Sequence, residues 1–565
     1  MSVFQSPIPN WRPRGLKAST ALTPVTLNSD MPIAQPSKLV VPDKLRERYQ
    51  TKKPGFVPSP QQADFFEWVA NGSGSCVLEA VAGAGKTTTL IQALGLMSGS
   101  IFFGAYNKKI SEEIRQKAAE AKVARPGLYI STMHAAGYAA CKQAWPKCNV
   151  DDRKSGKILK ALALEQPNLR LESYTAFICK MVSFGKQFLI GCADKPAIDD
   201  EAYWLHLMDH FSVDQDLPDD IDPRDILPHV MEVYRRSYAH CRIAIDFDDM
   251  VYAPLAYKLR MFKNDWVLVD ECQDINPARR ALASQLLKTG GRAIFVGDSR
   301  QAIYGFTGAG GDAIDLLVDQ FNCVRLPLTV TYRCPKSVVE YAHQWVTHIQ
   351  AHESALDGVV RTSIYNQPTD PKLPIDPWFI QDHPAETDAI LCRYTRPLIQ
   401  SAYKMIRAGI ACKVEGRDIG NGLIAICHMW RITSIARLEE RLEKYLAREI
   451  EKAKAADSER REQEITDKIE TLRIFIERCK GLGKHTIDEL VTEIKSMFDD
   501  NVSGLLTLST IHRSKGREWT KVYWIQTAGR RPSKKEWEAL QELNLNYVAC
   551  TRAMSELVLV PEAQV

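Results

Sequence analysis

A glycine-rich stretch near the start of the chain, LEAVAGAGKTTTL at residues 78–90, constrains the fold more than any other segment. A phosphate-binding loop needs small residues that let backbone N–H groups turn inward, a lysine for the outer phosphates and a hydroxyl for Mg²⁺. The apolar SCVLEAV before the stretch predicts a buried strand, and TTTLIQALGLM after it predicts a helix, as the motif requires. We therefore expect an α/β nucleotide-binding domain whose loop residues are Gly83, Ala84, Gly85, Lys86, Thr87 and Thr88.

Two adjacent carboxylates follow a later apolar strand. The segment DWVLVDECQDINP, residues 265–277, places Asp270 and Glu271 at the end of that strand. In a P-loop fold this position suits Asp270 for holding Mg²⁺, together with Thr87, and Glu271 for polarising the water that attacks the γ-phosphate. The sequence thus predicts ATP hydrolysis with Mg²⁺.

A second strand, in RAIFVGDSRQAIYGFTGA at residues 292–309, leads to a loop that combines an amide with aromatic residues. Gln301 can sense whether the γ-phosphate is present. Tyr304 and Phe306 can stack on nucleobases, although two core aromatic residues would produce the same pattern. The loop could join hydrolysis to a grip on nucleic acid.

Composition places the chain among globular proteins with several domains. It has 565 residues, 45% hydrophobic and 25% charged, which is too long for one core. No apolar run approaches the roughly 18 to 20 residues of a membrane span, and the N-terminus lacks a secretory signal. The 14 cysteines form no CxxC pairs, which favours reduced thiols over a structural zinc site. We expect a cytoplasmic protein of a bacterial or phage-infected cell, with no membrane contact.

The first 55 residues predict a flexible basic tail rich in proline. Residues 1–60 hold nine lysines and arginines against three acids, whereas the whole chain has a net charge of +4. Such a tail could contact nucleic acid or a protein partner, or it could be a solvated leader.

Six motifs follow one another in order: VAGAGKTTT, VDECQD, VGDSRQAIYGFTGA, LTVTYRCP, LSTIHRSKGREW and LNYVACTRA. This set resembles that of superfamily 1 DNA helicases, on the branch that includes UvrD, PcrA and Rep, from about residue 58 to 559. The resemblance implies an ATP-dependent motor on single-stranded DNA, moving 3′ to 5′, that unwinds tailed duplex DNA or displaces bound protein. A nucleic-acid-gated NTPase switch without processive movement is the alternative.

The resemblance also assigns residues. On the nucleotide side it implies that Gln62 and Tyr332 contact the adenine. Glu518, with Gly516 close by, would contact the ribose, and Arg333 and Arg552 would reach the γ-phosphate. On the DNA side it implies contacts from Tyr106, Asn107, Thr132, His134, Tyr304, Phe306, Arg393, His512 and Lys515. His134 and His512 could instead be buried structural histidines. Thr307 departs from the family's usual arginine, which removes a cation from the DNA path.

Motif order predicts two RecA-like motor domains, each a parallel sheet flanked by helices, with two mainly helical insertions. The expected division is a first motor of residues 56–150 and 241–325, a helical insertion of 151–240, a second motor of 326–425 and 503–565, and a charged helical insertion of 426–502.

Within the second insertion, apolar residues recur at spacings of three and four between residues 432 and 476, and 20 of the 34 residues at 437–470 are charged. This pattern predicts an antiparallel helical hairpin, followed by a helix that Thr486 and Glu489 open as a capping box. We expect a module docked on the motor, either a spacer or an arm for duplex DNA or a protein partner.

Overall fold

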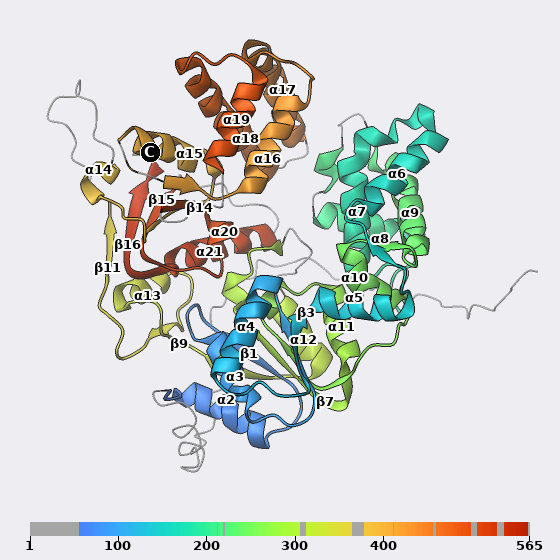
Figure 1. The fold of residues 1–565 in the computed structure, drawn as a ribbon, viewed down its shortest axis with the longest axis vertical. Helices are drawn as coiled ribbons and strands as arrows, with labels where there is room; N and C mark the ends of the chain where they lie inside the picture. The colour runs from blue at the N-terminus through green and yellow to red at the C-terminus, as the bar shows by residue number, and fades with distance from the viewer. Residues whose placement is uncertain are drawn as a thin grey trace, which may run out of the picture.

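Two six-stranded parallel sheets, each flanked by helices, organise the chain (Figure 1). The computed structural model describes residues 56–211, 213–217, 221–305, 312–363, 378–408, 410, 412–455, 459–498, 505–527 and 536–562. The predicted tail, Phe306 and Thr307 lie outside these residues. The predicted α/β class with parallel sheets is confirmed.

The first sheet has the strand order β3-β2-β6-β7-β1-β8. Its strands are β1 (Cys76–Ala80), β2 (Ile101–Ala105), β3 (Leu128–Thr132), β6 (Asn264–Val269), β7 (Leu287–Gly297) and β8 (Val324–Leu328). The inner strands are almost entirely buried because helices cover both faces of the sheet. The flanking helices are α2 (Pro60–Asn71), α3 (Lys86–Leu94), α4 (Lys108–Glu120), α5 (Met133–Ala144), α10 (Phe247–Ala256), α11 (Pro277–Leu286) and α12 (Ala313–Phe321). Strand β8 pairs with β1 and ends three residues beyond the expected boundary at residue 325.

The first insertion is a group of helices that stands beside this sheet in Figure 1. It consists of α6 (Lys154–Glu165), α7 (Thr175–Gln187), α8 (Glu201–His210) and α9 (Pro223–His240). Two short parallel strands, β4 (Asn149–Val150) and β5 (Ala244–Ile245), bring its ends together.

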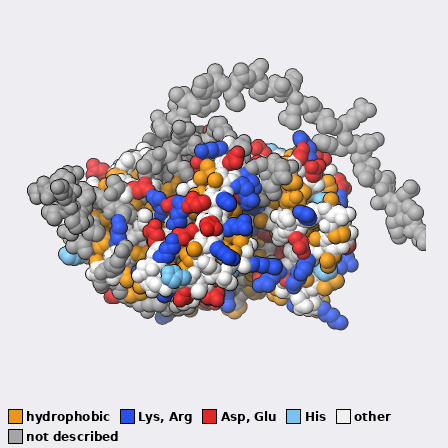
Figure 2. All heavy atoms as spheres, turned by 90° about the horizontal axis from the view of Figure 1, so that it is seen from above, with side chains coloured by type: hydrophobic (Ala, Val, Ile, Leu, Met, Phe, Trp, Pro, Cys, Tyr) orange, Lys and Arg blue, Asp and Glu red, His pale blue; other side chains and the backbone are white. Residues whose placement is uncertain are grey.

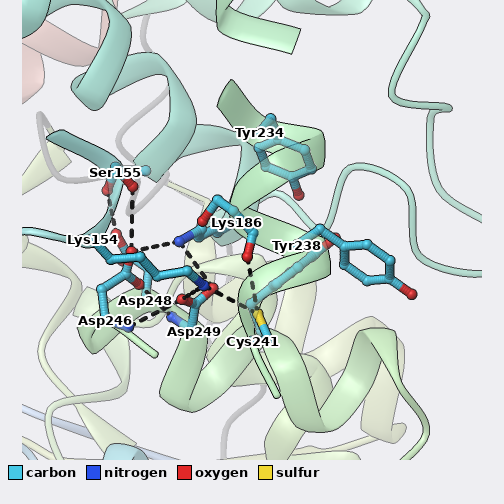
Figure 3. Close-up of polar contacts among 12 residues, drawn as sticks. Lys154, Ser155, Lys186, Tyr234, Tyr238, Cys241, Asp246, Asp248 and Asp249 are labelled. Atoms are coloured by element: carbon cyan, nitrogen blue, oxygen red, sulfur yellow. Dashed lines mark hydrogen bonds and ion pairs between the residues drawn. The ribbon is translucent and has the colours of Figure 1, made fainter. Parts of the chain in front are cut away.

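A buried ionic network fastens the insertion to α10. Lys154 Nζ lies 2.6 Å from Asp249 Oδ2, and Lys186 Nζ lies 2.9 Å from Asp249 Oδ1. Lys186 also pairs with Asp246 at 2.5 Å. Figure 3 shows these side chains converging from α6, α7 and α10. Because each charge has an opposite partner, the network holds three helices in one arrangement.

The second sheet has the order β11-β16-β15-β12-β14-β13 and is also entirely parallel. Its strands are β11 (Val359–Thr362), β12 (Ala389–Cys392), β13 (Cys412–Val414), β14 (Leu506–Thr510), β15 (Trp519–Gln526) and β16 (Ala553–Pro561). A further parallel pair, β9 (Val330–Thr331) and β10 (Gln350–Ala351), lies between the two sheets in sequence. The helices are α13 (Lys336–Ala342), α14 (Trp378–Asp382), α15 (Thr395–Arg407), α16 (Arg417–His428), α20 (Ile511–Ser514) and α21 (Glu536–Cys550).

The second insertion contains the predicted hairpin, α17 (Ile435–Ala455) and α18 (Glu459–Gly481), followed by α19 (Ile487–Met497). The capping box is present: the Glu489 N–H donates to the Thr486 hydroxyl, and the Glu489 carboxylate accepts from the Thr486 N–H at 3.0 Å. Figure 2, which views the molecule from the side where these helices lie in Figure 1, shows acidic and basic side chains interspersed. Charged residues of α17 such as Arg437, Glu443 and Lys444 are exposed, as the prediction of a solvated outer face requires.

The hairpin is docked on the second motor through a shared apolar cluster. Leu438 and Leu442 of α17 and Ile469 of α18 are buried in the same hydrophobic cluster as Ile390 and Leu508 of the second sheet. The inner faces of the hairpin therefore form part of the core of the second motor, since the apolar stripe of an amphipathic helix faces the core.

The hairpin also caps a motor helix. The Asp467 carboxylate on α18 accepts hydrogen bonds from the backbone N–H groups of Thr395 at 2.9 Å and Arg396 at 2.7 Å, in the first turn of α15. These N–H groups have no partner within their own helix, so a side chain from another element satisfies them.

All 14 cysteines are free thiols, and within the described ranges no helix is long and apolar enough to cross a membrane.

Candidate functional site

The predicted motifs of the first motor meet at one edge of its sheet. The phosphate loop follows β1, Tyr106 follows β2, Thr132 ends β3, Asp270 follows β6 and Asp298 follows β7. All five strands are parallel, so their carboxyl ends share one edge, which is where open α/β sheets bind ligands. Sequence-distant residues thereby form one candidate site.

The phosphate loop has the backbone shape that the sequence predicted. Gly83 and Gly85 have φ angles of 73° and 76°, a region that residues with side chains seldom adopt. A side chain at Gly83 would also collide with Arg333, because a Cβ there would lie 2.6 Å from the Arg333 Cβ. Lys86 begins α3, whose N-terminal N–H groups suit phosphate binding.

Lys86 faces the acidic pair. Its Nζ lies 3.1 Å from Glu271 Oε1. Burial by itself raises the pKa of Glu271, but Lys86 and Lys515 outweigh it and hold that pKa at about 2. Burial, reinforced by Glu271, raises the pKa of Asp270 to about 6. Glu271 is thus kept ionised beside the lysine that is expected to reach the phosphates.

Asp270 and Thr87 fit a Mg²⁺ site in their chemistry. Both offer oxygen ligands, which Mg²⁺ prefers, and Mg²⁺ usually takes only one or two protein ligands beside phosphates and water. No cluster of three or more His, Cys, Asp or Glu side chains suited to a metal occurs in the described ranges. Two oxygen donors leave coordination positions for phosphate oxygens and water, as Mg²⁺ sites beside nucleotides require.

Arg552 and Gln301 bring the two motors together at this edge. Arg552 is 1% exposed, and its Nη2 lies 3.3 Å from Gln301 Oε1. Gln301 in turn donates to Asp298 at 2.7 Å. Burial, followed by the repulsion of Arg333, lowers the pKa of Arg552 to about 10. This buried guanidinium remains charged at neutral pH and lies next to the predicted γ-phosphate sensor.

Arg333 and Glu518 form an ion pair at the mouth of the site. Arg333 also donates to the carbonyl of Thr551 at 3.5 Å, next to Arg552. Gly516, two residues before Glu518, has a φ angle of 81°. The two predicted arginines are therefore neighbours, whereas Glu518 is engaged by Arg333.

The predicted adenine contacts flank the phosphate loop. The Gln62 amide is 2% exposed and donates to the Thr89 hydroxyl at 2.9 Å. Tyr332 is 45% exposed, and its backbone N–H donates to the Gly83 carbonyl at 2.9 Å. Its ring lies against His352, with centroids 4.8 Å apart. The open ring face near the loop suits a stacking partner.

Helix α21 contributes contacts that the motif comparison did not identify. The Tyr547 hydroxyl accepts from the Ala82 N–H of the phosphate loop at 2.9 Å. Asn544 donates to the carbonyl of Ala302 at 2.9 Å, and Gln541 accepts from the Gly305 N–H at 3.1 Å. The three side chains recur every three residues on one helix face, a signal that could have suggested a shared contact.

Gln273 was also missed. Its amide donates to Glu271, and its Oε1 accepts from the Asp298 N–H at 3.1 Å. It therefore links the two acidic strand ends. Its position three residues after Asp270 was the one feature of the sequence that could have suggested a role at this site.

The predicted DNA contacts of the first motor cluster at the ends of β2 and β3. Tyr106 is 40% exposed. Asn107 and Thr132 cap α4 and α5 by accepting from the N–H groups of Ile110 and Ala135, so both side chains already have a structural partner.

His134 is half-buried beside them. Burial, then the positive charge of Arg279, lowers its pKa to about 4, so the imidazole is neutral at neutral pH and acts as a polar ring rather than as a cation.

Among the remaining predicted DNA contacts in the described residues, Tyr304 and Lys515 join the two motors. Tyr304 donates to the carbonyl of His512 at 3.0 Å, and the Lys515 ammonium lies 4.9 Å from the centre of its ring. Lys515 is 8% exposed, pairs with Asp274 at 2.5 Å and donates to the Gln301 carbonyl at 2.7 Å. Arg393 pairs with Glu542 at 2.9 Å. In this arrangement Lys515 faces inward, toward the sensor, and Tyr304 bridges the motors.

Comparisons with known proteins agree with this geometry. Residues 62–322 match the family model described as UvrD/REP helicase N-terminal domain, and residues 336–563 match UvrD-like helicase C-terminal domain. The chain is 26% identical over 315 residues to "ATP-dependent DNA helicase Rep" of Escherichia coli (strain K12), covering 50% of this chain and 42% of that protein. It is 22% identical over 308 residues to "ATP-dependent DNA helicase PcrA" of Leuconostoc citreum, covering 50% and 38%. A "Probable DNA helicase" of Mycoplasma pneumoniae is 35% identical over 100 residues, 18% of this chain and 19% of that protein. The matches span less than half the length of these relatives.

Proposed function

Because this chain belongs to the UvrD-like helicase family, a member of superfamily 1, we propose that it is an ATP-dependent motor that moves along single-stranded DNA and unwinds duplex DNA or displaces bound protein. The observation that carries the proposal is the buried contact of Arg552 from the second motor with Gln301 of the first. Because Arg552 and Gln301 belong to different motors, a change in the nucleotide bound at this contact can change the separation of the two motors.

The proposed chemistry uses groups that already face one another. Lys86 exchanges its Glu271 partner for the outer phosphates of ATP, which frees Glu271 to orient and deprotonate the attacking water. Arg552 and Arg333 stabilise the charge that develops on the transferred phosphoryl group. Asp270 and Thr87 would hold Mg²⁺, which would neutralise phosphate charge when bound.

The proposed DNA track crosses the carboxyl edge of the first sheet. Tyr106 is the exposed stacking surface, and the N-termini of α4 and α5, capped by Asn107 and Thr132, present positive ends to phosphates. The family resemblance favours 3′ to 5′ movement. We also propose the charged outer face of α17 and α18 as the contact for duplex DNA or a protein partner.

Translocation on tailed duplex DNA tests the motor. Two substrates, one labelled at the 5′ end of the strand and the other at the 3′ end, give the direction of movement. On duplex DNA with a 3′ tail, ATP-dependent release of the label from the 5′ end supports the proposal. ATP hydrolysis stimulated by DNA without release from either end would instead support an NTPase switch.

Two substitutions test the catalytic roles. Lys86→Ala and Glu271→Gln should both abolish ATP turnover, but Glu271→Gln should retain ATP binding because the phosphate-binding groups remain. Fluorescent-nucleotide binding measures this difference. Loss of binding in both variants would contradict the separate roles.

A further inference from the structure

A histidine outside the six motifs lies against the ring that is expected to stack on the adenine. The rings of His352 and Tyr332 have their centroids 4.8 Å apart and their planes inclined by 33°. Tyr332 is 45% exposed, so its ring keeps an open side although His352 covers part of it. The resemblance to helicases assigned Tyr332 to the adenine and gave His352 no role. A flat partner behind a stacking ring can determine which way that ring faces.

The backbone fixes this histidine beside Tyr332. Strands β9 and β10 pair in parallel, with Ala351 opposite Thr331. The His352 N–H continues the ladder by donating to the Thr331 carbonyl at 3.0 Å. The next residue of each strand is therefore Tyr332 on one side and His352 on the other, which brings their side chains together.

The imidazole of His352 has a partner that holds its plane. Its Nδ1 lies 2.7 Å from the Ser354 hydroxyl oxygen and accepts from the Ser354 N–H at 3.2 Å. Two contacts from one neighbouring residue restrict rotation of the ring about its side-chain bonds. The surface that His352 presents to Tyr332 is thus in place before a nucleotide binds.

The same segment is tied to both nucleotide-binding elements of the first motor. The Tyr332 N–H donates to the Gly83 carbonyl of the phosphate loop at 2.9 Å. On the α2 side, the Gln61 amide accepts from the Thr329 N–H at 2.7 Å and donates to the Thr329 hydroxyl at 2.8 Å. The ring pair of Tyr332 and His352 therefore has a defined position relative to the phosphate loop.

We propose that His352 is a positioning residue for ATP, which holds the Tyr332 ring in the orientation that stacks on the adenine. The histidine takes one side of the ring and the base takes the other. Without His352 the ring can turn away from the base, and the apparent affinity falls with the fraction of molecules whose ring is correctly placed. The inference rests on the proposed function, because it requires a nucleotide at the phosphate loop.

The test compares two competitors of a fluorescent nucleotide on the full chain, a non-hydrolysable ATP analogue and inorganic tripolyphosphate. Both present three phosphates to the loop, but only the analogue has a base. His352→Ala should weaken binding of the analogue about three- to fivefold, as loss of a ring contact of this kind would give. Binding of tripolyphosphate should not change. In ATPase assays, KM for ATP should rise by the same factor while kcat stays the same.

Two further variants separate ring stacking from folding. His352→Phe keeps a flat ring against Tyr332 and should recover most of the affinity for the analogue. The matched control is Glu353→Ala, because Glu353 is an exposed neighbour in the same loop. This control should bind both competitors as the unchanged chain does.

The outcomes distinguish the inference from the proposed function. Unchanged binding of the analogue by His352→Ala, or equal weakening of both competitors, would overturn the positioning role and leave the motor proposal intact. If His352→Phe bound the analogue as weakly as His352→Ala, ring stacking would be refuted as the cause. If the unchanged chain bound neither competitor, the proposed function would fail together with the inference.

Discussion

The substitution Asp249→Asn should strongly destabilise the first motor and its helical insertion. Asp249 is the shared partner of two ammonium groups, at 2.6 Å from Lys154 and 2.9 Å from Lys186, and the three side chains are 0%, 2% and 1% exposed. After the substitution, Asp246 is the only carboxylate that still pairs with either lysine in the described network. Leaving a buried charge without its partner costs about 3 to 5 kcal/mol.

Thermal unfolding followed by far-ultraviolet circular dichroism measures this loss. A cost of that size should lower the midpoint of the affected transition by about 10 °C for a domain of this size. Asp151→Asn is the matched control, because Asp151 forms an exposed pair with Lys157 at 2.7 Å and should leave the midpoint unchanged.

A double replacement separates charge from shape. Asp249→Leu combined with Lys154→Met removes a charge of each sign and retains most of the packing, so it should recover much of the lost stability. If Asp249→Asn unfolded at the same temperature as Asp151→Asn, the network would not stabilise the fold, and the reasoning from burial and pairing would be refuted.

Three further predictions follow from the same contacts. Burial raises the pKa of the Asp249 carboxyl, but the charges of Lys186 and Lys154 outweigh burial and hold this pKa at about 2. Because the pKa of an aspartate in the unfolded chain is about 3.9, the stabilisation should be complete above about pH 4 and should be lost between about pH 4 and 2 in acid-unfolding curves. Replacing residues 437–468 by a Gly/Ser linker removes core side chains and the Asp467 cap, so we expect loss of the cooperative transition and of ATPase activity; a folded, active product would show that the hairpin is dispensable. Tyr547→Phe removes the acceptor for the Ala82 N–H and should cost about 1 kcal/mol in ATP affinity, whereas unchanged nucleotide titration would exclude a role for this contact in holding the loop.

Local spacing made the nucleotide-binding half of the site predictable. The glycines of the phosphate loop, Lys86 and the Asp270–Glu271 pair carry their chemistry within a few residues, and each follows an apolar run that could only be a buried strand. The hairpin and the capping box at Thr486 were equally local. Motif order, through the family resemblance, indicated two motors with two insertions.

The inward position of Lys515 could not be predicted in the same way. A lysine in a loop predicts a phosphate contact as readily as an ion pair, and its partner Asp274 is 241 residues away. The contact of Tyr547 with the phosphate loop spans 465 residues. No periodicity connects residues at such separations, so only the docking of one motor on the other reveals them.

The sequence by itself determined the class of fold, the phosphate loop and the identities of the reactive groups, because short-range patterns of apolar, glycine and acidic residues are sufficient for these. Only the tertiary structure decided that the charged hairpin completes a core, that the Asp249 network fastens the first insertion, and that Lys515 of the second motor pairs with Asp274 of the first. The physical reason is that burial and pairing belong to surfaces that meet in space: the same amphipathic stripe or polar side chain has a different role according to what packs against it.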